Sequence, residues 1–253
     1  MAKEYLFKVR VFNKKKYHPL SVAAFCSGEK QFNKHNQKIY HSENVNRVTW
    51  NDLLVPEKDE TIYSHLPYYL KIKSEKKDII SNARNVLWQQ IDLIETREDS
   101  QFARLFEITI PYFFNEEEQI NFMKKAAKIF TAEGMIADSS IHKNTTNKEN
   151  SILDLFNVNS SNEEKSHNSE INKNNFTGFI LCTLRDYKEG NFSKKNREWN
   201  NAQKMIEWRT IILNILSEEI AKTNHLEEEK KIWQEKLTIY PEFNIIKKLK
   251  PKI

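Results

Sequence analysis

Segments that alternate between apolar and polar residues stand between segments with helical spacing, and this order most limits what the chain can fold into. Residues 104–111 read as a strand that Pro111 closes. Asn115 and Glu118 then form a capping pattern for a helix that ends at Gly134, and residues 134–142 form the next strand. Strands separated by helices in a chain of 253 residues indicate an α+β or an α/β sandwich.

The rest of the chain follows the same pattern. Residues 4–12 predict a half-buried strand with Tyr5, Phe7, Val9 and Val11 on one side. We also expect a short helix from Pro19 to Gly28, extended segments over 36–56, a helix over 76–103, a strand over 176–186, a loop over 189–199, a helix over 201–222 capped by Asn200, and a charged helix over 225–237.

Two regions differ in composition from the rest of the chain. Residues 143–175 contain ten asparagines and have a net charge of four lysines minus five acids, or −1. We interpret them as a flexible polar insertion. Residues 223–253 read as a charged helical tail with a basic end, which leaves residues 1–222 as the main domain.

The overall composition excludes several classes of protein. Two cysteines, Cys26 and Cys182, rule out a disulfide framework or a cysteine-built zinc site and read as packing residues. The longest apolar runs are too short to span a membrane, and the first twelve residues do not resemble a secretory signal. We therefore expect a cytoplasmic protein, and a net charge of +5 permits nucleic-acid binding without requiring it.

Few residue patterns in the sequence indicate a catalytic or metal-binding site by themselves. Seven histidines include no H-x-H pair, and four glycines give no phosphate loop. His142 ends a strand with Asp138 on the same face, although a polar strand end is the better interpretation of that pair alone. Trp199 and Trp208 fit a core better than a surface on which bases stack.

Five blocks, in their order and spacing, resemble the relaxase domain of the MobA/MobL family of plasmid mobilisation and conjugal transfer proteins, which includes TraA-like relaxases. The blocks are SVAAFCSGEK at 21–30, LWQQIDLIETREDSQFARLFEITIP at 87–111, GMIADSSIH at 134–142, FILCTLRD at 179–186 and KKNREWNNAQKMIEWR at 194–209. The resemblance implies an antiparallel sheet flanked by helices, hence the α+β class, of the kind found in HUH endonucleases.

The resemblance also implies a reaction. In the family, a tyrosine attacks a DNA phosphodiester at the transfer origin, and a divalent cation such as Mn²⁺ or Mg²⁺, held by three histidines, polarises the phosphate. The tyrosine position is occupied by Phe25 in this chain. His142 keeps the first metal histidine, and Thr177 and Phe179 stand where the other two belong. No cofactor is therefore expected.

The resemblance also bears on other residues near the expected site. Glu107 keeps its family position as a candidate acid or structural partner, and Tyr17 and Tyr40 are poor substitutes for the nucleophile because neither lies on the short helix. The expected contacts to DNA are basic residues: Arg104, Arg185, Lys194, Lys195 and Arg197.

Three functions remain open at this point. The first is a relaxase-fold protein that binds single-stranded DNA at a transfer origin, with accessory transfer proteins as further partners, but has lost strand cleavage, either as an accessory or as the product of a decaying gene. The second is an active relaxase that uses other residues. The third is an adaptor whose tail at 225–253 binds a partner protein.

Overall fold

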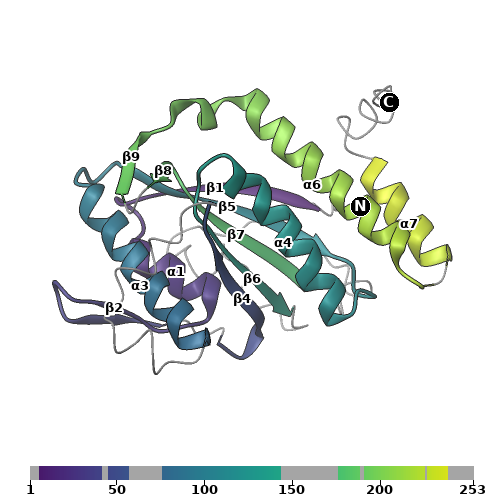
Figure 1. Cartoon of the computed structure of the whole chain (residues 1–253), viewed down its shortest axis with the longest axis horizontal. Coiled ribbons are helices and arrows are strands. Elements are labelled where there is room, and N and C mark those ends of the chain that lie inside the picture. The colour runs from purple at the N-terminus through teal and green to yellow at the C-terminus, as the bar shows by residue number, and fades with distance from the viewer. Residues whose placement is uncertain are drawn as a thin grey trace, which may run out of the picture.

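The computed structural model describes residues 6–41, 45–56, 76–143, 176–188, 191–225 and 227–238, which build a five-stranded antiparallel sheet with helices on both faces (Figure 1). The sheet has the order β1-β5-β7-β6-β4 and confirms the α+β class. Its strands are β1 (Phe7–Asn13), β4 (Val48–Leu54), β5 (Gln101–Ile110), β6 (Ala137–Lys143) and β7 (Phe176–Thr183).

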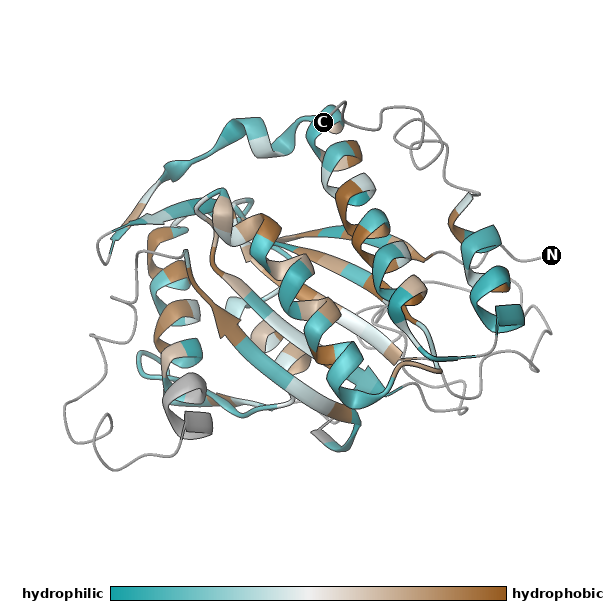
Figure 2. Ribbon diagram, turned by 45° about the vertical axis from the view of Figure 1, so that its right-hand side comes forward, coloured by the Kyte–Doolittle hydropathy of each residue, from teal (hydrophilic) through white to brown (hydrophobic). Residues whose placement is uncertain are grey.

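The helices divide between the two faces of the sheet and form a core on each. Helices α1 (Pro19–Ser27) and α3 (Lys76–Ile94) cover one face, which we call the α1 face. Helices α4 (Glu116–Ala132), α6 (Ala202–Lys222) and α7 (Glu227–Thr238) cover the other. Apolar and polar segments alternate along α4 and α6, as expected for helices with one buried side (Figure 2).

The predicted signals at the ends of α1 and at the start of α4 are confirmed. Pro19 stands at the start of α1. His18 caps the helix there, because its ring nitrogen Nδ1 accepts a hydrogen bond from the Leu20 N–H. Gly28 ends the helix with φ 69°, a left-handed conformation that favours glycine. Asn115 and Glu118 form the expected capping box of α4.

Two small antiparallel pairs lie outside the main sheet. One consists of β2 (Gln31–Asn33) and β3 (Lys38–Tyr40). The other consists of β8 (Arg185–Lys188) and β9 (Asn191–Lys195). The prediction of a loop over 189–199 is therefore wrong for β9, whose polar residues form a strand through pairing with β8 that their own sequence does not indicate.

Two helix predictions also need correction. The helix expected over 76–103 ends at Ile94, because a polar turn that contains an Arg97–Asp99 ion pair follows and Gln101 then pairs with β1. Helix α6 is capped by Asn201 instead of Asn200, since the Asn201 side chain accepts from the Gln203 N–H.

The first strand alternates only in part as predicted. Phe7 is buried, but Val9 and Val11 are 37% and 39% exposed. Because β1 is an edge strand, its middle extends beyond the cover of the helices.

The expected division at residue 222 stays a prediction, but α7 is not a free tail. Trp233 and Leu237 are buried in the same core as α4 and α6. The insertion at 143–175 lies almost wholly outside the described residues. Within the described part of the chain, no helix is both long enough and apolar enough to cross a membrane.

Candidate functional site

The register of the sheet brings the predicted site residues together on the α1 face. Lys8 pairs with Glu107, which pairs with Phe179, so these three residues form one row across β1, β5 and β7. In the next row, Thr177 pairs with His142 on β6. The three positions that the resemblance assigns to metal ligands and the position of the candidate acid are therefore neighbours in the fold.

Helix α1 brings Phe25 onto these rows. The Phe25 ring lies 5.8 Å from the ring of His142 and 6.1 Å from that of Phe179, measured between centroids. The rings of His142 and Phe179 lie 4.6 Å apart, edge to face. All three side chains are buried. We call Phe25, His142 and Phe179 the aromatic cluster.

His142 is held as a neutral imidazole. Its Nε2 lies 2.7 Å from the carbonyl oxygen of Cys26, and because a carbonyl only accepts, this nitrogen carries the proton. Burial lowers the pKa of His142 to about 4, the hydrogen bond to Cys26 opposes that change, and the charge of Arg47 adds to it. His142 is thus uncharged at neutral pH.

The residues present do not fit the divalent cation that the family uses. A phenyl ring at Phe179 has no donor atom, the hydroxyl of Thr177 is a weak ligand, and Nε2 of His142 is already engaged by Cys26. Over the described ranges, no group of three or more His, Cys, Asp or Glu side chains is placed to hold a metal ion.

Glu107 lies at the open side of the site beside two cations. Its carboxylate is 3.7 Å from Nζ of Lys8 and 3.5 Å from Nη2 of Arg10. Both distances exceed those of charge-assisted hydrogen bonds, which are about 2.7–2.9 Å. Glu107 is therefore an ion-pair partner in a half-buried setting, and its role as an acid stays a prediction.

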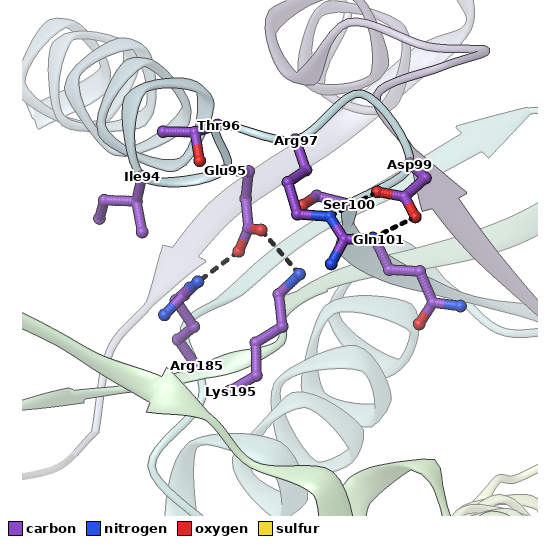
Figure 3. Close-up of a pocket in the computed structure, with 9 residues that line it drawn as sticks. All are labelled: Ile94, Glu95, Thr96, Arg97, Asp99, Ser100, Gln101, Arg185 and Lys195. Atoms are coloured by element: carbon purple, nitrogen blue, oxygen red, sulfur yellow. Dashed lines mark hydrogen bonds and ion pairs between the residues drawn. The ribbon is translucent and has the colours of Figure 1, made fainter.

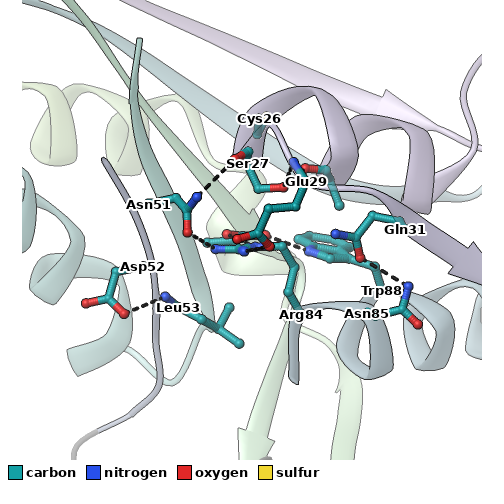
Figure 4. Close-up of polar contacts among 12 residues, drawn as sticks. Cys26, Ser27, Glu29, Gln31, Asn51, Asp52, Leu53, Arg84, Asn85 and Trp88 are labelled. Carbon is teal, nitrogen blue, oxygen red and sulfur yellow. Dashed lines mark hydrogen bonds and ion pairs between the residues drawn. The ribbon is translucent and has the colours of Figure 1, made fainter. Parts of the chain in front are cut away.

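A charge network that the sequence analysis missed connects α3 to β6 and to the residues that follow α1, and Figure 4 shows its members Glu29, Arg84 and Trp88. The guanidinium of Arg84, fully buried on α3, donates to Asp138 at 2.8 Å and also pairs with Glu29. The indole of Trp88 donates to the second oxygen of Asp138 at 2.9 Å. We call Arg84, Asp138, Glu29 and Trp88 the charge network.

The charge network fixes the positions of α1 and β6. Burial alone lowers the pKa of Arg84, but Asp138 and Glu29 raise it overall. Burial raises the pKa of Asp138, and the Arg84 and Trp88 donors oppose that rise. Because Glu29 follows α1 and Asp138 lies on β6, the network sets how Phe25 faces His142.

Two of the basic residues predicted to bind DNA, Arg185 and Lys195, form ion pairs with the same carboxylate, that of Glu95. Nε of Arg185 and Nζ of Lys195 lie 2.8 Å and 2.6 Å from the two oxygens of Glu95, whose side chain is 3% exposed (Figure 3). They line an open hollow of about 450 Å³ together with Arg97 and Asp99. The hollow lies near Gln101, six residues along β5 from Glu107, which corresponds to about 20 Å at 3.4 Å per residue.

The other predicted DNA contacts divide into exposed and buried residues. Lys194 and Arg197 are exposed. Arg104 is 4% exposed, and its guanidinium donates to the Trp199 carbonyl at 2.6 Å and to Asn200 at 2.7 Å. The terminal nitrogens of Arg104 hold the residues before α6, so its burial gives the predicted DNA contact no support, and that contact stays a prediction. Trp199 and Trp208 are buried, as predicted for core residues.

The two tyrosines near the lost nucleophile lie at the other end of α1. The Tyr40 ring stacks on His18 at 4.5 Å, and Tyr17 packs edge to face on Phe12. His18 precedes Phe25 by seven helical residues, or about 10 Å at 1.5 Å per residue. Burial also raises the pKa of Tyr40, which makes it a poorer nucleophile at neutral pH.

Two features of the site had recognisable signals in the sequence. Glu29 belongs to the block SVAAFCSGEK, one of the five that carry the family resemblance. Lys8 and Arg10 alternate with apolar residues, which placed them on one face of β1 but not beside Glu107. Arg84 had no signal, since an arginine within a helix is ordinarily exposed.

Comparisons with known proteins agree with this geometry. The model of the MobA/MobL family matches residues 19–238. A solved structure described as "Molecular Basis of Vancomycin Resistance Transfer in Staphylococcus aureus" is similar in fold, with a TM-score of 0.61 and 22% identity over 86% of this chain and 93% of that chain. Comparison with curated proteins gave no match. Since the family model covers most of the described sheet and the helices on both its faces, the chain belongs to the MobA/MobL family.

Proposed function

We propose that this chain binds single-stranded DNA at a transfer origin without cleaving it. The observation that carries the proposal is the aromatic cluster, in which Phe25 faces His142 and Phe179 at the place where the family resemblance puts the reacting groups. A phenyl ring has no oxygen to attack phosphorus. The scaffold for a single strand is retained, but the groups that would break its backbone are missing.

The DNA affinity is expected to depend on salt. Basic side chains that neutralise phosphates release counterions, so the affinity should fall with a log–log slope of roughly −0.7 for each phosphate contacted. The measurement is fluorescence anisotropy of a labelled oligonucleotide from 50 to 300 mM salt. Absence of binding at the lowest salt, or binding that salt does not change, would contradict the proposal.

Covalent capture on a denaturing gel tests the loss of cleavage. We expect no adduct with single-stranded oligonucleotides from a candidate transfer origin, with Mn²⁺ or Mg²⁺ added. Phe25→Tyr alone should also stay inactive, because an unassisted phenol has a pKa near 10 and the cation still lacks ligands. An adduct with the unmodified chain would contradict the proposal, and peptide mapping would then identify the nucleophile.

The triple variant Phe25→Tyr, Thr177→His, Phe179→His is the matched gain-of-function test. It supplies a phenol opposite His142 and adds two imidazoles on β7, one paired with His142 and one beside it. Thr177→His with Phe179→His, but without the tyrosine, is its control, since this variant should bind metal and form no adduct.

A further inference from the structure

This inference rests on the proposed function and concerns where on the molecule the DNA backbone lies. The α1 face has a covered half and an open half. Leu105, Leu181 and Leu53 are buried beneath α1 and α3, whereas Glu107, Thr109 and Thr177 are only partly buried. The aromatic cluster lies at the boundary between these halves.

Three cations border the open half. Lys8 and Arg10 extend from β1, with side chains 43% and 23% exposed. Arg47 ends the 3-10 helix η1 (Val45–Arg47) directly before Val48, which pairs with His142. The charge of Arg47 reaches the imidazole of His142. Cations therefore stand on both sides of the row that contains Glu107 and Phe179.

Cations outnumber acids among the residues named at this site. Lys8, Arg10 and Arg47 bring three positive charges, Glu107 brings one negative charge as an ion-pair partner of Lys8 and Arg10, and His142 is neutral. In addition, Nε of Arg10 and one oxygen of Glu107 are buried without a hydrogen-bond partner among the described residues. Arg104 also has an Nε without a partner, but its two terminal nitrogens donate to Trp199 and Asn200, whereas Nη2 of Arg10 has the looser ion pair with Glu107 at 3.5 Å.

We propose that Lys8, Arg10 and Arg47 form a binding site for a phosphodiester of the single strand, laid across the aromatic cluster. The guanidinium of Arg10 offers planar donors that suit phosphate oxygens, and Lys8 adds a point charge beside it. Glu107 holds Lys8 and Arg10 in place and limits the affinity by repelling the anion. The site binds the backbone independently of base sequence.

The test uses the full chain and fluorescein-labelled (dT)20 in an anisotropy titration at 50 mM salt. Changing Lys8, Arg10 and Arg47 together to Gln should weaken binding at least about tenfold and make the salt slope shallower by roughly 2, at 0.7 for each of three contacts. Lys124, Lys128 and Lys231, which are exposed on α4 and α7, provide the matched control when changed to Gln. This control loses the same charge and should bind within about twofold of the unmodified chain.

A second variant separates loss of the site from loss of folding. Glu107→Gln removes the repelling carboxylate, so it should bind (dT)20 several-fold more tightly, a gain that misfolding cannot produce. Unchanged or weaker binding by Glu107→Gln would overturn the site. If the Lys8, Arg10 and Arg47 variant binds normally while Lys194→Gln with Arg197→Gln abolishes binding, the proposed function stands and this inference is wrong.

Two further arms identify the ligand. Inorganic phosphate at millimolar concentration should compete only weakly, because a strand makes several contacts at once. If phosphate displaced (dT)20 completely at that concentration, or if (rU)20 bound much more tightly through the same three residues, the assignment to a single DNA strand would be wrong. If the unmodified chain binds no oligonucleotide at all, the proposed function itself fails.

Discussion

The charge network and the aromatic cluster lie side by side on one face of the sheet but are built from opposite kinds of side chain. The network joins a buried guanidinium to the buried carboxylate of Asp138 and the partly buried carboxylate of Glu29. The cluster has two phenyl rings and an uncharged imidazole. Asp138 and His142 are on the same strand, only four residues apart.

This contrast separates what supports a site from what reacts in it. Buried charges are costly unless each is paired, so the network constrains every member at once. The cluster has no such mutual requirement, because aromatic side chains fill the same volume in many combinations. The scaffold can therefore stay intact while the side chains that would perform chemistry are replaced.

The largest expected effect is a gain of metal binding by the cluster. Thr177→His with Phe179→His should bring two imidazoles beside His142 and create a micromolar Mn²⁺ site, provided that the His142 ring releases the Cys26 carbonyl. Calorimetric titration should show this site in the variant and no saturable binding in the unmodified chain. A stoichiometric site in the unmodified chain that His142→Ala removes would show that the cluster still binds metal.

The next effect is the loss of stability when the network is broken. Arg84→Met should lower the free energy of unfolding by about 3–5 kcal/mol, because the buried carboxylate of Asp138 and the partly buried carboxylate of Glu29 would both lose their cation. Urea denaturation measures this change. Arg97→Met is the control, since its ion pair with Asp99 is exposed and should contribute little to the free energy of unfolding. Equal losses for the two variants would show that the buried network constrains the fold no more than an exposed ion pair does.

The third effect is the pH dependence that His142 gives to the cluster. The folded pKa is about 4 and the ordinary value is 6.5, so between them the unfolded chain binds more protons. The contribution of His142 is complete above about pH 7 and decreases as the pH falls towards 4. At pH 5 the unmodified chain should have lost about 2 kcal/mol that His142→Gln does not lose.

Denaturation at pH 7.5 and pH 5 checks this expectation. Glutamine is chosen because its amide can still donate to the Cys26 carbonyl. Asp138 titrates in both proteins, so the difference between them isolates His142. The same pH dependence in both would mean that the imidazole is not buried as described.

The smallest effect concerns the packing of the cluster itself. Phe179→Leu removes the edge-to-face contacts with His142 and Phe25 but keeps an apolar side chain, so it should cost about 1 kcal/mol. Thermal unfolding followed by circular dichroism is sufficient to measure it. A loss as large as that of Arg84→Met would show that the cluster is as tightly constrained as the network.

Much of the site could be predicted from the sequence, and the remainder depended on pairing between distant strands. The family resemblance placed Thr177 and Phe179 on the strand expected over 176–186, and β7 sets Thr177 beside His142. The burial of Arg104 could not be predicted, because the local sequence does not indicate that its guanidinium donates to the Trp199 carbonyl ninety-five residues away. The strand β9 was missed because its polar residues depend on β8 for their conformation.

The sequence by itself determined the α+β class, most of the helix ends and the absence of a phenolate at Phe25, since capping, periodicity and residue identity are local properties. Only the tertiary structure decided that Lys8 and Arg10 stand beside Glu107, that Arg84 is buried among carboxylates, and that Nε2 of His142 is taken by Cys26. The reason is physical. The charge state and free donors of a side chain depend on its neighbours in space, and in an antiparallel sheet with β1 and β5 paired across about ninety residues, those neighbours are set by register.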